Sequence, residues 1–119
     1  MPMSDKPIVL ICGSRNIDYV NLDLYIDPNS VGEIVSGGAN GIDTLAESWA
    51  KKHNIEFVAY LPDYEHYGKR APLVRDEDMV NFCDVVIAFW DGSSTGTLYT
   101  CNYAKKMGRK VYLHIIKER

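Results

Sequence analysis

The chain alternates between short apolar runs, rich in β-branched residues, and segments whose apolar residues recur at helical spacing. The apolar runs predict strands at residues 8–12, 33–36, 56–61, 84–89 and 110–115. The helical rhythm predicts helices at residues 18–26, 41–53, 74–82 and 98–107, the first of them the weakest. Strands that alternate with helices in this way are typical of a parallel sheet with right-handed helical crossovers. We therefore expect an α/β fold with five parallel strands.

The hydrophobicity of the predicted strands is nearly continuous along the chain and does not alternate. Residues 8–11 and 85–88 contain no polar side chain. Strands of this kind are covered on both faces, so we expect helices on both sides of an open sheet. We also expect the strand order 3-2-1-4-5, in which the first and fourth strands flank the point where the order reverses. Open parallel sheets bind their ligands outside the carboxyl ends of the strands at this point.

Two glycine-rich turns, residues 36–43 and 92–97, each follow an apolar run and lead into a helical segment. A strand that ends in glycine and turns into a helix exposes backbone N–H groups at the positive end of the helix dipole. Such groups bind phosphate or another anion. Glycine also serves ordinary tight turns, and one such turn would be a weak signal. Two turns in one small domain predict a nucleotide-like ligand.

The candidate ligand-binding residues come from these turns, from the tips of the first and fourth strands, and from residues 62–75. The stretch 62–72 is predicted to be a long loop, and such loops in compact domains usually carry function. The candidates are Gly13, Ser14, Arg15, Ser36, Gly37, Gly38, Ala39, Asp43, Tyr64, Tyr67, Lys69, Arg75, Trp90, Asp91, Gly92, Ser94, Thr95, Gly96 and Thr97.

The charged candidates each have a second interpretation. Arg15 at the tip of the first strand is placed to pair with a phosphate, but it also fits a solvated surface arginine; Arg75 is the stronger phosphate ligand. Asp43 is explained equally by contact with a ribose hydroxyl or a cation and by stabilisation of its helix dipole. Asp91 is a candidate carboxylate near the ligand, although Asp-Gly is a common turn dipeptide and the turn is favoured.

The aromatic candidates also divide between ligand and core. Trp90 is placed to stack on a base, but an aromatic residue just after a buried strand is as often part of the core or an interface. Trp49 lies on an amphipathic helix and is assigned to the core. Tyr64 and Tyr67 are better candidates for base stacking because their predicted loop is polar.

Length, charge and residue counts narrow the class of protein. The 119 residues form one predicted domain, residues 1–119, and the net charge of −3 argues against a chain built to coat nucleic acid. No apolar stretch is long enough to span a bilayer, and residues 1–7 do not resemble a signal peptide, so we expect a cytoplasmic protein without a membrane partner.

Cysteine, histidine and glycine spacing argue against the common cofactor sites. The three cysteines form no CxxC pair and the three histidines show no i, i+4 pair; they are Cys12, Cys83, Cys101, His53, His66 and His114. Neither a disulfide nor a metal site is predicted, and the cysteines are interpreted as buried thiols. Gly13 is not followed by the further glycines of a GxGxxG fingerprint, which disfavours NAD-dependent hydride transfer. We therefore expect no cofactor.

Together these residues resemble the SLOG superfamily of Rossmann-like nucleotide-binding proteins, and within it the YspA-type branch. The resemblance covers nearly the whole chain. It rests on residues 13–15, 36–43, 63–69, 75–79, 84, 88–92 and 94–97. It implies a Rossmann-like fold and a nucleotide-like ligand. Its wider relatives include the DNA-processing protein A, the LOG phosphoribohydrolases and sensor domains for nucleotide-derived signals.

The chain differs from these relatives at the position of the catalytic glutamate and at other positions of the motifs. In LOG enzymes a PGGxGTxxE turn supplies a glutamate for cleavage of the N-glycosidic bond, together with an arginine four residues before a methionine. Arg75 and Met79 keep that spacing, but the glutamate position is Thr100. The usual Arg-Asn pair of the YspA-type pattern is Arg75-Asp76 here, and residues 72–73 replace a Gly-Pro step.

Three functions remain as hypotheses. The first is a module that binds or senses a nucleotide or an ADP-ribose-like molecule. The second is a nucleotide N-glycosidase or phosphoribohydrolase, with Arg75, Asp43 and Asp91 as candidate catalytic residues. The third is a DNA-processing accessory protein, which the acidic balance disfavours. Because the superfamily commonly forms dimers, a homodimer through the helices at 74–82 and 98–107 is expected, with a monomer as the alternative.

Overall fold

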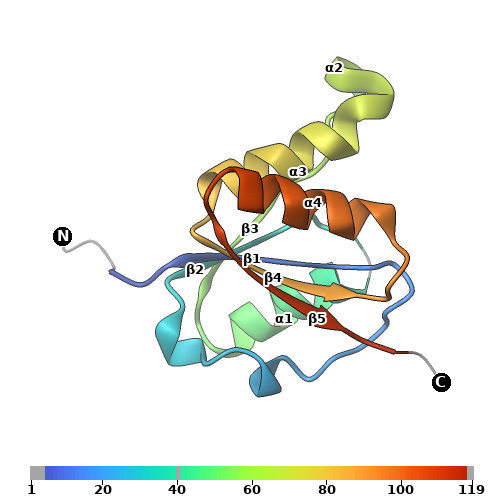
Figure 1. Cartoon of the computed structure of the whole chain (residues 1–119). Coiled ribbons are helices and arrows are strands. Elements are labelled where there is room, and N and C mark those ends of the chain that lie inside the picture. The colour runs from blue at the N-terminus through green and yellow to red at the C-terminus, as the bar shows by residue number, and fades with distance from the viewer. Residues whose placement is uncertain (1–4, 40, 118–119) are drawn as a thin grey trace.

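The computed structural model describes residues 5–39 and 41–117 and contains a five-stranded parallel sheet (Figure 1). The strands are β1 (Ile8–Gly13), β2 (Glu33–Ser36), β3 (Glu56–Ala59), β4 (Val85–Trp90) and β5 (Lys110–Ile115). They lie in the order β3-β2-β1-β4-β5, and every neighbouring pair is parallel. The predicted α/β, Rossmann-like fold and its strand order are confirmed.

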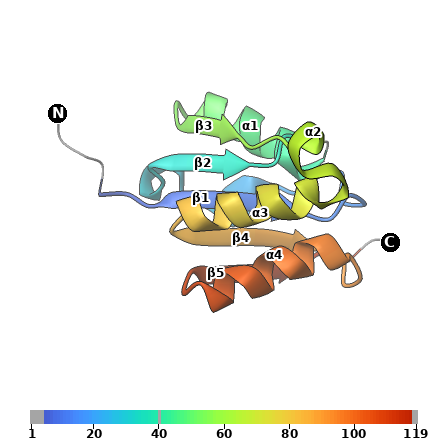
Figure 2. The same ribbon diagram turned by 90° about the horizontal axis from the view of Figure 1, so that it is seen from above.

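Helices cover both faces of the sheet, as the continuous hydrophobicity of the strands predicted. Helix α1 (Ile42–Lys52) packs on one face, and α3 (Ala71–Phe82) and α4 (Thr95–Lys106) pack on the other. Viewed from above, α3 runs over β1 and α4 runs over β4 and β5 (Figure 2).

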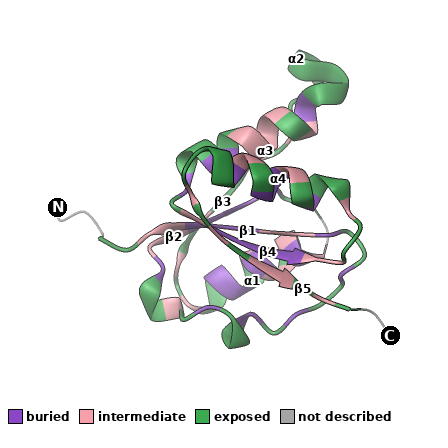
Figure 3. Ribbon diagram, in the orientation of Figure 1, coloured by how far each residue is buried: buried purple, intermediate pink, exposed green. Residues whose placement is uncertain are grey.

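Successive residues of the central strands feed two separate hydrophobic clusters. In β1, Val9 and Ile11 join the cluster under α1, which also buries Trp49 as predicted, whereas Leu10 joins the cluster under α3 and α4. The period of two along a strand sends alternate side chains to opposite faces. Figure 3 shows the consequence, with buried residues concentrated in the central strands and more exposed residues in β3 and β5 at the edges.

The predicted helix at 18–26 is wrong. Two single 3-10 turns, η1 (Leu22–Leu24) and η2 (Pro28–Ser30), stand in this connection. Asn21 and Asp27 lie just before these turns, and each side chain accepts a hydrogen bond from the backbone N–H two residues on. Such local bonds compete with helix formation. The apolar residues of the segment still pack into the α1 cluster, which is why their spacing imitates a helix.

The predicted loop at 62–72 is also wrong, because most of it is helical. A single turn, α2 (Tyr64–Tyr67), is followed by the 3-10 turn η3 (Gly68–Arg70), which leads directly into α3. The Asp63 side chain accepts a hydrogen bond from the backbone N–H of His66 and so caps α2. In Figure 1, α2 stands at the end of α3 and projects away from the sheet.

Candidate functional site

A cleft of about 190 Å³ lies at the carboxyl ends of β1 and β4, where the strand order reverses. Seven predicted ligand-binding residues line it: Gly13, Arg15, Ala39, Arg75, Ser94, Gly96 and Thr97. Four residues that were not predicted as ligands complete the lining: Cys12, Pro72, Asp76 and Thr100. A neighbouring hollow of about 400 Å³ shares Arg15, Ser94 and Gly96 with the cleft and adds Asn16, Asp91, Ser93 and Thr95.

The second glycine-rich turn is open to this space. Ser94 caps α4, and its side chain accepts a hydrogen bond from the backbone N–H of Thr97. Among the described residues, no group accepts a hydrogen bond from the N–H of Thr95 or Gly96. A Cβ atom added to Gly96 would meet nothing within 4 Å. The start of α4 therefore presents free donors to the cleft, beside the cationic side chain of Arg15.

Two candidate ligand residues hold this turn in place. The Oδ1 atom of Asp91 accepts hydrogen bonds from the backbone N–H groups of Ser93 and Ser94, at 2.9 and 2.8 Å, and these bonds lower the pKa of Asp91. The indole N–H of Trp90 donates to the carbonyl oxygen of Ser94 at 2.9 Å. The interpretation of Asp91 as a turn residue is supported by these contacts.

Ser14 ties the tip of β1 to the same turn. Its side chain is buried, and its Oγ accepts a hydrogen bond from the backbone N–H of Asp91 at 3.1 Å. The same oxygen lies 3.3 Å from Oγ1 of Thr97 at the start of α4. Ser14 therefore positions the end of β4 and the first turn of α4 relative to β1. Gly92 takes a positive φ of 91° in the turn, which favours glycine.

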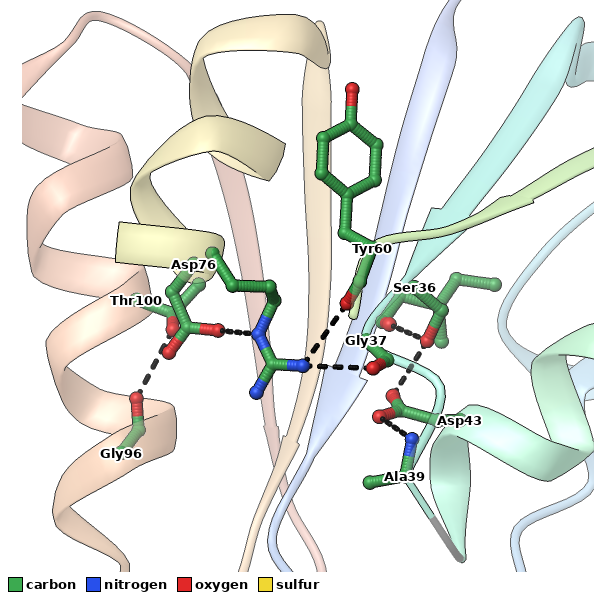
Figure 4. A network of polar contacts seen from close by, with 10 residues as sticks. Ser36, Gly37, Ala39, Asp43, Tyr60, Asp76, Gly96 and Thr100 are labelled. Atoms are coloured by element: carbon green, nitrogen blue, oxygen red, sulfur yellow. Dashed lines mark hydrogen bonds and ion pairs between the residues drawn. The ribbon is translucent and has the colours of Figure 1, made fainter. Parts of the chain in front are cut away.

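The first glycine-rich turn is filled by groups of the protein itself. A Cβ atom on Gly37 would lie 2.8 Å from Nη1 of Arg75, and one on Gly38 would lie 2.5 Å from Cδ2 of Leu61. Asp43 closes the turn from within: its Oδ1 lies 2.5 Å from Ser36 Oγ, and its Oδ2 accepts from the N–H of Ala39 at 3.0 Å (Figure 4). Among the described residues the two turns therefore differ: the second opens widely to a ligand, whereas the first contributes only Ala39 to the lining of the cleft.

Arg75 joins three elements at the wall of the cleft. Its Nη1 donates to the carbonyl oxygens of Gly37 and Tyr60, at 2.8 and 3.1 Å, and its Nε donates to Oδ1 of Asp76 at 2.8 Å. Its side chain is only 16% exposed. Within the described part of the chain, Nη2 makes no hydrogen bond. Met79, one turn further along α3, is buried in the core, so packing accounts for its place in the Arg75–Met79 spacing.

Asp76 is the carboxylate of the cleft, and sequence reasoning did not select it. Its side chain is 15% exposed, and burial raises its pKa, although the adjacent Arg75 and a hydrogen bond from Thr100 act in the opposite direction. Figure 4 shows Asp76 beside Thr100, the position where the resemblance to LOG enzymes places a glutamate. The Oγ1 of Thr100 donates to the carbonyl oxygen of Gly96 at 3.1 Å. In this chain α3, not α4, supplies the acidic group.

This raised pKa predicts that Asp76→Asn does not destabilise the protein at neutral pH. Between the ordinary carboxyl pKa of about 3.9 and the raised folded value, the folded state binds more protons than the unfolded state, so stability falls as pH rises through this window. At pH 7 the cost of the buried charge is present in full, and asparagine removes it while still accepting from Arg75. The guanidinium of Arg75 keeps the carbonyl oxygens of Gly37 and Tyr60 as partners, so it is not left without acceptors. Urea unfolding should give an equal or higher midpoint for the variant at pH 7, and a smaller difference at pH 4. A lower midpoint at pH 7 would contradict this.

Cys12 lines the floor of the cleft, but burial raises the pKa of its thiol well above the ordinary value. The thiol is therefore protonated near neutral pH, which argues against a nucleophilic role. Cys83 and Cys101 are buried, as predicted, whereas Cys12 is only partly buried. Within residues 5–39 and 41–117, no group of three or more acidic, histidine or cysteine side chains is arranged to hold a metal ion.

The remaining candidates lie outside the cleft. Tyr64 and Tyr67 on α2 are 60% and 44% exposed, and Lys69 follows on η3. None of the three lines the cleft or the hollow beside it. Their segment projects beyond the start of α3, as Figure 1 shows. Base stacking on these side chains remains a prediction.

A larger hollow of about 440 Å³ lies on the α1 face of the sheet, against β1, β4 and β5. Its lining is mainly apolar and includes Tyr25, Ile87 and Tyr112. It contains no lysine or arginine, and its polar residues include Asp27 and His114. In contrast to the cleft, this hollow offers an anion no arginine.

Residues 7–67 match the YspA, cpYpsA-related SLOG family. The Gene 61 protein of Mycobacterium phage D29 is 36% identical over 113 residues, which cover 84% of this chain and 90% of that protein. The chain belongs to the YspA, cpYpsA-related SLOG family.

The SLOG match and the cleft overlap only in part. The matched residues include β1, β2, β3 and the filled first turn, whereas α3, α4 and the open second turn follow after them. The side chains of Arg75 and Asp76 and the free donors of α4 thus come from the part of this SLOG protein beyond the family match. The cleft is formed where the two parts meet.

The fold of this SLOG protein is also similar to that of DNA processing protein A (DprA) from Streptococcus pneumoniae. The TM-score is 0.68 at 22% sequence identity, and the similarity covers 91% of this chain and 50% of the DprA chain. This chain therefore spans about half the length of DprA. In the described residues no helix has the length and apolar character needed to cross a membrane.

Proposed function

We propose that this SLOG protein binds a nucleotide or a nucleotide-derived molecule such as ADP-ribose, with a phosphate group at the start of α4. The observation that carries the proposal is the pair of free N–H groups at Thr95 and Gly96, which lie beside Arg15 where the cleft and the neighbouring hollow meet. Donors at a helix N-terminus, strengthened by the helix dipole and an adjacent guanidinium, suit an anion. The family and the DprA-like fold support a nucleotide-related or DNA-processing role.

The shape of the site supports a ligand with more than one part. The cleft of about 190 Å³ is smaller than the roughly 300 Å³ at which pockets for drug-sized ligands begin. It continues past Arg15 and Gly96 into the hollow of about 400 Å³. A phosphate at the shared boundary would place a small group in the cleft and leave the larger hollow for the rest of the molecule.

Isothermal titration calorimetry with AMP, ATP, NAD and ADP-ribose tests this proposal. We expect saturable binding of at least one of these compounds. The Arg15→Ala variant should bind it about tenfold more weakly, since a charge-assisted hydrogen bond contributes about 1.5–3 kcal/mol and Arg15 is exposed to solvent. Lys106→Ala removes an exposed cation at the other end of α4 and should bind as the wild type does. Equal affinities of Arg15→Ala and wild type would show that Arg15 does not contact the ligand.

The contacts of Asp43 and Asp91 favour binding over hydrolysis at these two residues. Asp43 and Asp91, the two carboxylates considered for N-glycosidic cleavage, both accept hydrogen bonds from backbone groups of their own turns. Incubation with nucleoside monophosphates should therefore leave them intact, with no free base detected by chromatography. A gel shift with single-stranded DNA at low salt tests the DNA-processing hypothesis, for which the net charge of −3 predicts no shift.

We also propose a homodimer through the outer faces of α3 and α4. Large apolar side chains are exposed there, including Phe82 at 43%, Leu98 at 37% and Met107 at 40%. A second copy that covered them would remove apolar surface from water. Light scattering at micromolar concentration should show a particle larger than the 13.5-kDa chain. A particle of 13.5 kDa would refute the dimer and leave the cleft to a single chain.

A further inference from the structure

The acidic groups near the cleft differ in whether their oxygen atoms are already occupied. Asp43 uses both oxygens within the first turn, at Ser36 and Ala39. Asp91 uses Oδ1 for two backbone N–H groups and Oδ2 for the side-chain amide of Asn16, at 3.1 Å. Asp76 is the carboxylate that lines the cleft itself. It is therefore the acidic group placed to meet a ligand there.

Asp76 has acceptor capacity left over. A carboxylate offers about four lone-pair positions. Arg75 Nε occupies one of them at 2.8 Å. The hydroxyl of Thr100 donates its single proton to the carbonyl oxygen of Gly96 at 3.1 Å and takes at most one further position on Asp76. At least two positions therefore remain for donors in the cleft. A carboxylate in a cleft that still has acceptor positions available favours a ligand that completes its hydrogen bonds.

The net charge of the Arg75–Asp76 pair determines which hydrogen-bond donors of a ligand suit Asp76. Arg75 lies next to Asp76 and already balances its negative charge, while the carbonyls of Gly37 and Tyr60 fix the guanidinium. A cationic ligand would gain little from a pair that is already neutral. Neutral hydroxyl groups can use the free acceptor positions without leaving a charge unbalanced.

We propose that Asp76 is a specificity-determining residue that accepts hydrogen bonds from the vicinal hydroxyls of a pentose whose phosphate lies at the start of α4. The inference rests on the proposed function, because it uses the same phosphate position beside Arg15 and Gly96. Asp76 and Gly96 line one cleft of about 190 Å³, so a group that extends from the phosphate into this cleft lies against Asp76. In a nucleotide this group is the sugar. The site thus takes ribosyl phosphates in preference to deoxyribosyl phosphates.

Calorimetry with ribose 5-phosphate, 2-deoxyribose 5-phosphate and inorganic phosphate tests the inference. The wild type should bind the ribose compound at least about tenfold more tightly than the deoxy compound, because the deoxy compound lacks one hydroxyl that donates to the charged carboxylate of Asp76. Asp76→Asn should lose this preference and bind inorganic phosphate as tightly as the wild type or more tightly, since a nearby negative charge is gone. A general loosening of the fold would weaken the binding of ribose 5-phosphate and of inorganic phosphate alike. Loss of the ribose preference with undiminished affinity for inorganic phosphate would therefore be specific to Asp76.

Asp78→Asn is the matched control, because it makes the same chemical change at an exposed position of the same helix. It should leave both the preference and the phosphate affinity unchanged. The inference is overturned if the wild type binds both sugar phosphates equally, or if folded Asp76→Asn keeps the preference for ribose 5-phosphate. In either case the proposed function stands as long as the wild type binds phosphate compounds. Absence of binding to any phosphate compound by the wild type overturns both. The comparison of ribose 5-phosphate with 2-deoxyribose 5-phosphate uses the wild type alone, so it does not depend on whether a variant folds.

Discussion

Replacement of Arg75 by alanine is expected to lower the free energy of unfolding by about 3 kcal/mol, the scale observed when one partner of a buried ion pair is removed. The variant leaves Asp76 as a charge without its partner at a site only 15% exposed. It also leaves the carbonyl oxygens of Gly37 and Tyr60 without their guanidinium donor. These losses affect the first turn, the end of β3 and α3 together. Urea unfolding followed by circular dichroism measures the change.

Two further variants separate this effect from a general loss of charge. Arg70→Ala removes an exposed arginine just before α3 and should change stability by less than about 0.5 kcal/mol, as surface substitutions usually do. Arg75→Ala combined with Asp76→Asn should recover part of the lost stability, because the unpaired buried charge is no longer present. If Arg75→Ala were as stable as the wild type, the bonds around Arg75 would not hold these elements together.

Gly96→Val is expected to abolish ligand binding while the protein stays folded. The added Cβ meets nothing within 4 Å, and the backbone at Gly96 is not in the positive-φ region, so the fold accepts the side chain. Valine also has a higher helix propensity than glycine. Its methyl groups would stand between the free N–H groups of α4 and the ligand phosphate, at the boundary of both hollows. We expect affinity for the bound nucleotide to fall at least 100-fold, about 2.7 kcal/mol.

Asn102→Val serves as the control, since it places the same side chain at an exposed position of α4 away from the cleft. It should bind ligand as the wild type does. Thermal unfolding of both variants by circular dichroism verifies that they are folded. Unchanged affinity in folded Gly96→Val would place the phosphate elsewhere. The equivalent change at Gly38 is not a clean test, because that glycine has a φ of 77° and its Cβ would clash with Leu61.

The fold could be predicted from the sequence because its strands are buried on both faces and leave long apolar runs. Such a run places successive residues on opposite faces of the sheet, so Val9 and Ile11 pack in one hydrophobic cluster and Leu10 packs in the other. The helix predicted at residues 18–26 was wrong, because the apolar residues of this segment pack on the core without forming a helix. There the side chains of Asn21 and Asp27 determine the local structure.

The candidate site was less predictable, because a glycine-rich turn does not reveal what occupies the space beside it. At Gly37 that space is taken by Arg75, which lies 38 residues later in the chain. Asp76 was overlooked although a signal exists: Met79 and Val80 follow it at i+3 and i+4 and are buried, so its side chain lies on the apolar face of α3. An acidic residue on such a face indicates a functional or paired carboxylate.

The central claim is that a phosphate-bearing ligand binds at the start of α4, and an NMR titration locates it most directly. In spectra of the ¹⁵N-labelled protein titrated with AMP, we predict saturable shifts of the amide signals of Thr95 and Gly96, together with Gly13 and Arg15. The same titration of Gly96→Val should leave the remaining signals unmoved. No saturable shifts in the wild type, or shifts confined to α2 or to the apolar hollow on the α1 face, would contradict the account.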